Sequence, residues 1–185
     1  MIVFHCDSNK ILQAPFKTKA DKHCLAAYNS IRGRLKSLSH KVDLQILDNE
    51  SSTEYKRFIT EDWGSRYQLV PPDMHSHNVD ERAICTFNAH FLITLARTCA
   101  QFPICLWDQI LEQAELTLNI MREATYDPRE SAWEYLHGRS FNYDTTPLGP
   151  QWIPVIMHNK PSRQKSWDYR GCNGFSTDVV LKHYR

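Results

Sequence analysis

Apolar residues recur along the chain with two different spacings, and these spacings predict its secondary structure. Short apolar runs and alternating apolar positions predict strands at 2–6, 11–16, 42–46 and 67–70. Apolar residues three and four positions apart predict helices at 20–38, 53–62, 81–95 and 104–121. Because the first two strands are joined by a short turn sequence, we expect a hairpin followed by an α/β layered arrangement.

Asp48 follows one of these strands directly. Apolar and polar residues alternate from 42 to 46, which predicts a strand with one buried face. Because Asp48 is two residues beyond Ile46, its side chain would lie on that same face. A buried carboxylate requires hydrogen-bond donors, a cation or a metal ion, since otherwise it takes up a proton. Asp48 is therefore a functional candidate. Alternatively, its carboxylate only caps the turn at 49–51.

Glu81 lies in the first turn of the helix expected at 81–95, with its side chain directed toward the helix start. Because Asn78 precedes it by three residues, the pair also has the sequence pattern of a capping box, in which Glu81 would bind only the backbone of Asn78. The local pattern leaves both a capping role and a ligand role open for Glu81.

Composition places the chain among ordinary globular proteins. Its 185 residues are 42% hydrophobic and 23% charged, enough for one substantial core with a small appendage. No apolar run reaches the ~20 residues of a membrane span, and no secretory leader is evident, so we expect an intracellular protein without membrane insertion. Six cysteines without a Cys-x-x-Cys pair argue against a zinc knuckle and favour reduced thiols. His75 and His77 form only a weak candidate metal pair.

The net charge of +1 conceals an uneven distribution. Seven Lys or Arg residues lie between 17 and 41, six lie between 158 and 185, and the remainder of the chain is acidic. Basic segments on both sides of an acidic centre suit contacts with nucleic-acid phosphates near a metal site, although a basic helix face is more often plain solvated surface.

Four short motifs follow one another with a recognisable order and spacing. They are Ile46-Leu-Asp48-Asn49-Glu50, Tyr67-Gln-Leu-Val-Pro-Pro72, Asn78 through Glu81-Arg82-Ala-Ile, and Thr86-Phe87 with His90-Phe91. This series resembles the integrase catalytic core of copia-like retrotransposon polyproteins, over nearly the whole chain. The resemblance implies an RNase H-like α/β fold, a mixed sheet flanked by helices. It divides the chain into an integrase-core-like domain at 1–146 and the start of a small β-rich region at 147–185.

The same resemblance implies a function, metal-dependent DNA strand transfer, which is the chemistry of DNA integration. In the family three acidic residues hold two divalent ions, Mg²⁺ or Mn²⁺, and Asp48 and Glu81 match the second and third of them. The implied partner is DNA, both element ends and target, with a homo-oligomer allowed and a location in the nucleus or in a cytoplasmic virus-like particle. The implied DNA contacts are Arg82, Asn88, Lys160, Arg163 and Lys165.

This copy departs from the family at two places. The family's first catalytic Asp lies on a strand before the hairpin and is not among these residues, while Asp7, in the hairpin turn, is a poor replacement. Asn88 stands where the family commonly has a Lys that contacts DNA. We therefore expect a fragment of an integrase without strand-transfer activity. The alternative is a non-catalytic RNase H-like module that binds nucleic acid or a protein partner.

The absent strand also has a structural consequence in this interpretation. In the family's sheet it lies between the hairpin and the Asp48 strand. We therefore expect the hairpin to be poorly anchored or to pair in a substitute way, since an unpaired strand edge is a liability.

Overall fold

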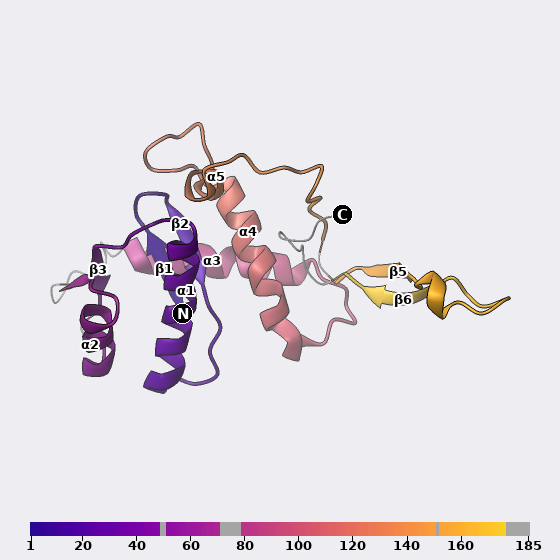
Figure 1. The fold of residues 1–185 in the computed structure, drawn as a ribbon, viewed down its shortest axis with the longest axis horizontal. Coiled ribbons are helices and arrows are strands. Elements are labelled where there is room, and N and C mark those ends of the chain that lie inside the picture. Colours follow the sequence, from indigo (N-terminus) through magenta and orange to yellow (C-terminus); the bar gives the residue numbers. More distant parts are fainter. Residues whose placement is uncertain (49–50, 71–78, 151, 177–185) are drawn as a thin grey trace.

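The computed structural model describes residues 1–48, 51–70, 79–150 and 152–176, arranged as a mixed α/β structure (Figure 1). Its elements are, in chain order, β1 (Ile2–His5), β2 (Lys10–Gln13), α1 (Asp21–Ser37), β3 (Leu44–Leu47), α2 (Thr53–Glu61), β4 (Arg66–Leu69), α3 (Val79–Ala96), the 3₁₀ helix η2 (Ile104–Ile110), α4 (Leu111–Met121), α5 (Ala132–His137), β5 (Pro154–His158), the 3₁₀ helix η3 (Pro161–Arg163) and β6 (Gly171–Phe175). The first seven elements confirm the predicted order β-β-α-β-α-β-α.

The described strands pair as three separate two-stranded sheets. β1 and β2 form the predicted antiparallel hairpin, β3 and β4 pair in parallel, and β5 and β6 form a second antiparallel hairpin. A parallel pair needs a crossover connection, which α2 supplies between β3 and β4. Among the described residues, no strand joins the first hairpin to the parallel pair.

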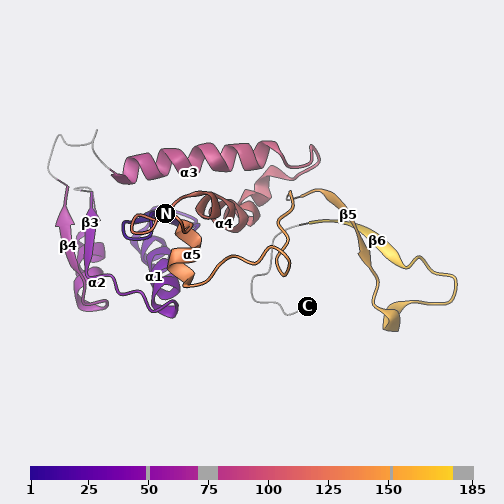
Figure 2. The same ribbon diagram turned by 90° about the horizontal axis from the view of Figure 1, so that it is seen from above.

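The first hairpin lies between two layers of helices (Figure 2). Because neighbouring residues of a strand point to opposite faces, Leu12 packs with Ile31 of α1 and Leu136 of α5, whereas Ile11 packs with Phe87 of α3 and residues of α4. All four residues of β2 are buried. The hairpin is therefore the centre of the hydrophobic core.

The outer edge of β2 is bound by side chains of α4. The Ile11 amide donates to Asn119 Oδ1 at 2.9 Å, Asn119 Nδ2 donates to the Ile11 carbonyl at 2.8 Å, and the Gln13 amide donates to Glu115 Oε2 at 3.0 Å. These bonds satisfy the backbone groups that a neighbouring strand would otherwise bind. The expectation of a poorly anchored hairpin is therefore wrong, because α4 holds it.

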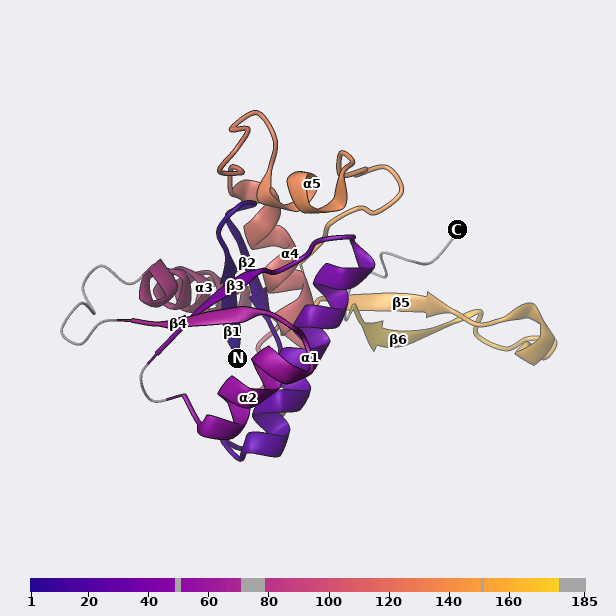
Figure 3. The ribbon, with the colours of Figure 1, turned by 60° about the vertical axis from the view of Figure 1, so that its left-hand side comes forward.

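The buried face of β3 is the opposite of the predicted one. Leu44 and Ile46 are 47% and 49% exposed, whereas Leu47 is only 5% exposed. The reason is the position of α1 and α2, which both pack on the other face of the strand, where Leu47 contacts Tyr28 and Ile59. Figure 3 shows β3 and β4 crossing beside these two helices. Asp48 therefore continues a half-exposed row rather than a buried one.

The helix predicted at 104–121 is interrupted. Residues Ile104–Ile110 form the 3₁₀ helix η2, with a kink at Leu106, and α4 follows it. Within the predicted apolar stripe, Leu111 and Leu118 are buried, but Ile104 and Met121 are more than 60% exposed. The stripe was therefore predicted correctly in its middle and wrongly at its two ends.

Two further elements follow α4. Helix α5 begins with a capping box between Ser131 and Glu134 and ends at Gly138, whose φ of 61° is left-handed. The β5–β6 hairpin then projects away from the helices (Figures 1 and 2). None of the helices in the described part of the chain is long and apolar enough to span a membrane.

Candidate nucleic-acid and metal site

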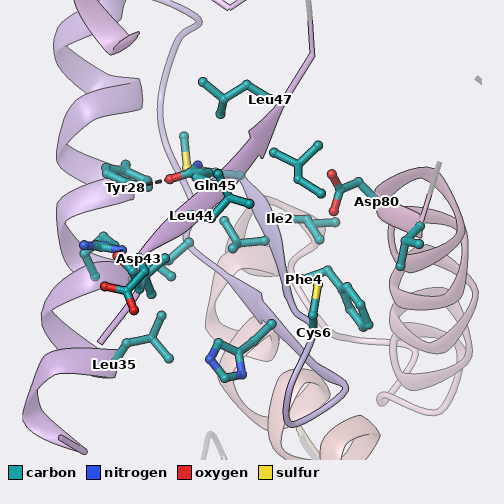
Figure 4. A pocket seen from close by; sticks show the side chains of 18 of the residues that line it. Ile2, Phe4, Cys6, Tyr28, Leu35, Asp43, Leu44, Gln45, Leu47 and Asp80 are labelled. Atoms are coloured by element: carbon teal, nitrogen blue, oxygen red, sulfur yellow. Dashed lines mark hydrogen bonds between the residues drawn. The ribbon is translucent and has the colours of Figure 1, made fainter. Parts of the chain in front are cut away.

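A cavity of about 700 Å³ opens between β1 and β3 (Figure 4). The residues of both strands line it, and α1 forms a wall between them with Tyr28, Ile31 and Leu35. The first turn of α3 closes one end through Val79 and Asp80. We call this cavity the inter-sheet groove.

Asp48 and Asp80 both line the inter-sheet groove. Asp48 follows the carboxyl end of β3, where the Ser51 amide donates to its carbonyl in a turn, and its side chain is exposed. Figure 4 shows the Asp80 carboxylate beside Ile2, on the side of the groove where α3 begins. The Asp48 strand end and the acidic first turn of α3 therefore border the same groove.

Glu81 follows Asp80 on α3 and is exposed, but it does not line the groove. Successive residues of an α-helix are rotated by about 100°, so the two side chains leave the helix in different directions. Asn78, the partner in the capping-box alternative, lies outside the described residues, as do His75 and His77. The capping and ligand roles of Glu81 both stay predictions.

Charge is distributed unevenly along the groove. Partial burial raises the pKa of Asp80, so its carboxyl group is less acidic than usual. At the other end, the guanidinium of Arg32 donates to Ser65 Oγ at 2.8 Å and to the Val42 carbonyl at 3.4 Å, close to the start of β3. The carboxyl end of β3 is thus acidic, and the amino end carries a buried cation.

Asp7 lies at that amino end as well. It follows β1, whose last residue, His5, contacts the ring of His40 at 5.7 Å between centroids, just before β3 begins. Asp7 and Asp48 therefore border opposite ends of the groove, and whether Asp7 can replace the family's first Asp stays untested.

The carboxylates near the groove can be compared with the ligands that a divalent ion requires. Asp48 and the first turn of α3 offer carboxylate oxygens, the ligands that Mg²⁺ and Mn²⁺ prefer. Among the described residues, no group of three or more His, Cys, Asp or Glu side chains is clustered closely enough to hold a metal. Binding of Mg²⁺ or Mn²⁺ at this place therefore stays a prediction.

The predicted DNA contacts fall on two surfaces. Arg82 and Asn88 are exposed on α3, while Lys160 and Lys165 are exposed on the long connection between β5 and β6. The side chain of Arg163 and the basic residues beyond 176 lie outside the described part of the chain. The two described surfaces are separate, because the hairpin projects from the end of the molecule away from β3 and β4 (Figure 1).

Two kinds of residue were not identified from the sequence. Asp80 is adjacent to Glu81, and only the direction of the helix start decides which of them enters the groove. Trp167 and Tyr169 are almost fully exposed beside Lys165 and Arg170. Aromatic residues interleaved with basic ones are a signal of nucleic-acid binding that could have been found in the sequence.

In comparisons with known proteins, no protein-family model and no curated protein matches this chain.

Proposed function

We propose that this chain is the core of an integrase-type protein with an RNase H-like fold, which binds DNA and whose parent reaction is metal-dependent strand transfer. The observation that carries the proposal is that Asp48 and the acidic first turn of α3 both line the inter-sheet groove. Carboxylates at the carboxyl end of a parallel strand, opposite a helix start, suit the binding of a divalent ion and a phosphate.

In this proposal Asp48 and a carboxylate of the first turn of α3 hold Mg²⁺ or Mn²⁺; the resemblance implies Glu81 as this second ligand, whereas Asp80 is the residue of that turn that lines the groove. A bound ion would polarise a phosphate oxygen and lower the pKa of a coordinated water or hydroxyl. Strand transfer requires charge stabilisation at both the attacking and the leaving oxygen, and two carboxylates provide for one ion only. We therefore expect no strand transfer from these residues alone.

The DNA-binding part of the proposal is supported by the β5–β6 hairpin. Its connection carries Lys160, Lys165 and Arg170, which can neutralise phosphates, together with exposed Trp167 and Tyr169, which can stack on bases. On α3, Arg82 adds a cation near the acidic end of the groove. In the cell this activity belongs in the nucleus or in a virus-like particle, where an element's DNA is found.

A second candidate is a non-catalytic module that binds nucleic acid. The exposed aromatic residues of the β5–β6 connection favour it, because they lie apart from the inter-sheet groove and need no metal to bind a single strand. Unlike the first candidate, this function predicts that substitutions of Asp48 and Glu81 leave every measured activity unchanged.

The test is a strand-transfer and binding assay on a labelled DNA duplex, with Mg²⁺ or Mn²⁺ present. We expect the wild-type chain to bind DNA in a salt-sensitive way and to form no product. We also expect Mg²⁺ to change the affinity of the wild-type chain for DNA, and this change should be lost in Asp48→Asn and in Glu81→Gln. The control is Asp108→Asn, which replaces an exposed carboxylate before α4 and should retain the change.

Each outcome of this assay is decisive for one part of the proposal. A strand-transfer product that disappears in both variants would show that two carboxylates suffice, and Asp7→Asn would then test the remaining acidic residue. Absence of DNA binding at low salt would reject both candidate functions.

A further inference from the structure

The connection between β5 and β6 forms the tip of the projecting hairpin (Figures 1 and 2). It runs from Asn159 to Arg170 and includes the 3₁₀ helix η3. Two of its aromatic side chains, Trp167 and Tyr169, are almost fully exposed, so they add almost nothing to the hydrophobic core. Exposure alone is ordinary for a single apolar side chain, but the backbone that carries Trp167 is not ordinary.

Trp167 has an unfavourable backbone conformation. The Asp168 amide donates to the Lys165 carbonyl at 3.2 Å, so residues 165–168 form a turn with Trp167 at its third position. The φ of Trp167 is 73°, in the left-handed region, where a bulky residue is strained and glycine is the ordinary choice. The strain presents an exposed ring to solvent without any gain in packing. Strained residues of this kind are concentrated at functional sites.

Asn159 holds the two ends of the connection together. Its amide donates to the Arg170 carbonyl at 2.8 Å, and its side-chain Nδ2 donates to the Tyr169 carbonyl at 3.1 Å. Gln164 Nε2 donates to the Asn159 carbonyl at 2.6 Å. These bonds hold the backbone before and after Trp167, so the two exposed rings are carried by an ordered loop. Such preorganisation reduces the entropy that is lost when a ligand binds.

The charges around the two rings favour an anionic ligand. The sequence from 159 to 170 contains four basic residues and one acidic residue, Asp168. The side chains of Lys160, Lys165 and Arg170 are exposed. Cations neutralise phosphates and aromatic rings stack on bases, so the combination suits a nucleic-acid strand. Because the bases of an intact duplex already stack on one another, only unpaired bases are free to stack on these rings.

We propose that Trp167 and Tyr169 form a binding site for unpaired bases of DNA, in which each ring stacks on one base while Lys165 and Arg170 contact the flanking phosphates. The site selects DNA with an unpaired end over an intact duplex. This inference rests on the DNA binding proposed above, but not on the metal site, and it specifies the form of DNA that the β5–β6 hairpin binds.

The test is fluorescence anisotropy with the full chain and two labelled probes, a blunt DNA duplex and the same duplex with an unpaired tail of about six nucleotides. We expect the wild-type chain to bind the tailed duplex more tightly. Trp167→Gly should weaken this binding at least about fivefold, the lower end of the effect of losing one stacked base, and Tyr169→Ala should do the same. Binding of the blunt duplex should change by less than about twofold in both variants, because its bases stay stacked.

Trp167→Gly also separates a binding role from a structural one. Glycine adopts a φ of 73° without strain, so we expect the melting temperature of this variant to stay the same or to rise. Trp167→Phe keeps an aromatic ring and should retain most of the affinity for the tailed duplex. Tyr126→Ala is the matched control for Tyr169→Ala, because Tyr126 is also exposed but lies outside the hairpin. It should bind both probes as the wild-type chain does.

Three results would overturn this inference alone. They are equal affinity of the wild-type chain for the two probes, unchanged binding of the tailed duplex by Trp167→Gly, and equal weakening of both probes in that variant. A lower melting temperature of Trp167→Gly would assign the ring a structural role and would also contradict it. Absence of binding to either probe at low salt would instead reject the DNA binding of the proposed function, and this inference with it.

Discussion

Replacing Asn119 by Leu should destabilise the chain by removing the anchor of the first hairpin. Asn119 is completely buried, and its side chain binds both the amide and the carbonyl of Ile11, as well as the Glu115 carbonyl at 2.7 Å. Leu has a similar size but offers neither a donor nor an acceptor. The substitution therefore leaves two backbone groups of Ile11 buried without a partner.

The magnitude follows from those two groups. An unsatisfied buried donor or acceptor costs about 1–3 kcal/mol, so the expected loss in free energy of unfolding is about 2–6 kcal/mol. This is a large part of the roughly 5–15 kcal/mol that a domain possesses. With a urea m-value of about 2 kcal/mol/M, the midpoint should fall by at least about 1 M.

The assay is urea unfolding followed by circular dichroism, with Asn88→Leu as the matched control. Asn88 is exposed on α3, so its substitution should change the free energy of unfolding by less than about 0.5 kcal/mol. A loss below about 1 kcal/mol for Asn119→Leu would refute the reasoning, because it would mean that Ile11 does not depend on α4 for its hydrogen bonds.

Three further predictions concern stability and DNA binding. Burial lowers the pKa of His137 to about 4, below the 6.5 of the unfolded chain, so the free energy of unfolding should fall as pH decreases from 6.5 to about 4. Thermal unfolding at several pH values measures this dependence, and His137→Gln should flatten it. Ser131→Ala removes the N-cap of α5 and should cost about 1 kcal/mol in urea unfolding, with no loss contradicting the capping box. Changing Lys160, Lys165 and Arg170 together to Gln should reduce the slope of log affinity for DNA against log salt by up to about 2.7, and an unchanged slope would exclude the β5–β6 connection as a phosphate contact.

The sequence predicted the order and type of the first seven elements, because helical and strand spacings are properties of one segment at a time. It failed for the faces of β3, where alternation favoured Leu44 and Ile46 as buried residues. Which face is covered depends on how α1 and α2 cross the strand, and no local pattern contains that information. The exposed ends of the 104–121 stripe have the same cause, since nothing described packs against Ile104 or Met121 closely enough to bury them.

The position of Asp48 could be predicted from the sequence, but its role as a metal ligand stays a prediction. Asp48 was identified, and it lies at the end of β3 as expected, but on the half-exposed side of the strand. The neighbouring residues Asp80 and Glu81 could not be distinguished by spacing, because the choice depends on the rotation of α3 about its axis. The anchor of Ile11 by Asn119 joins residues 108 positions apart, so it could not be read from any local motif.

The most direct test of the proposed function is to map the metal site by iron-mediated cleavage. Fe²⁺ replaces Mg²⁺ at carboxylate sites, and with ascorbate and peroxide it cuts the backbone beside the bound ion. We predict cleavage near both Asp48 and Glu81, suppressed by excess Mg²⁺ and lost in Asp48→Asn and in Glu81→Gln, but retained in Asp108→Asn. Cleavage at only one of the two segments, or equal cleavage in all variants, would contradict an ion shared by Asp48 and Glu81.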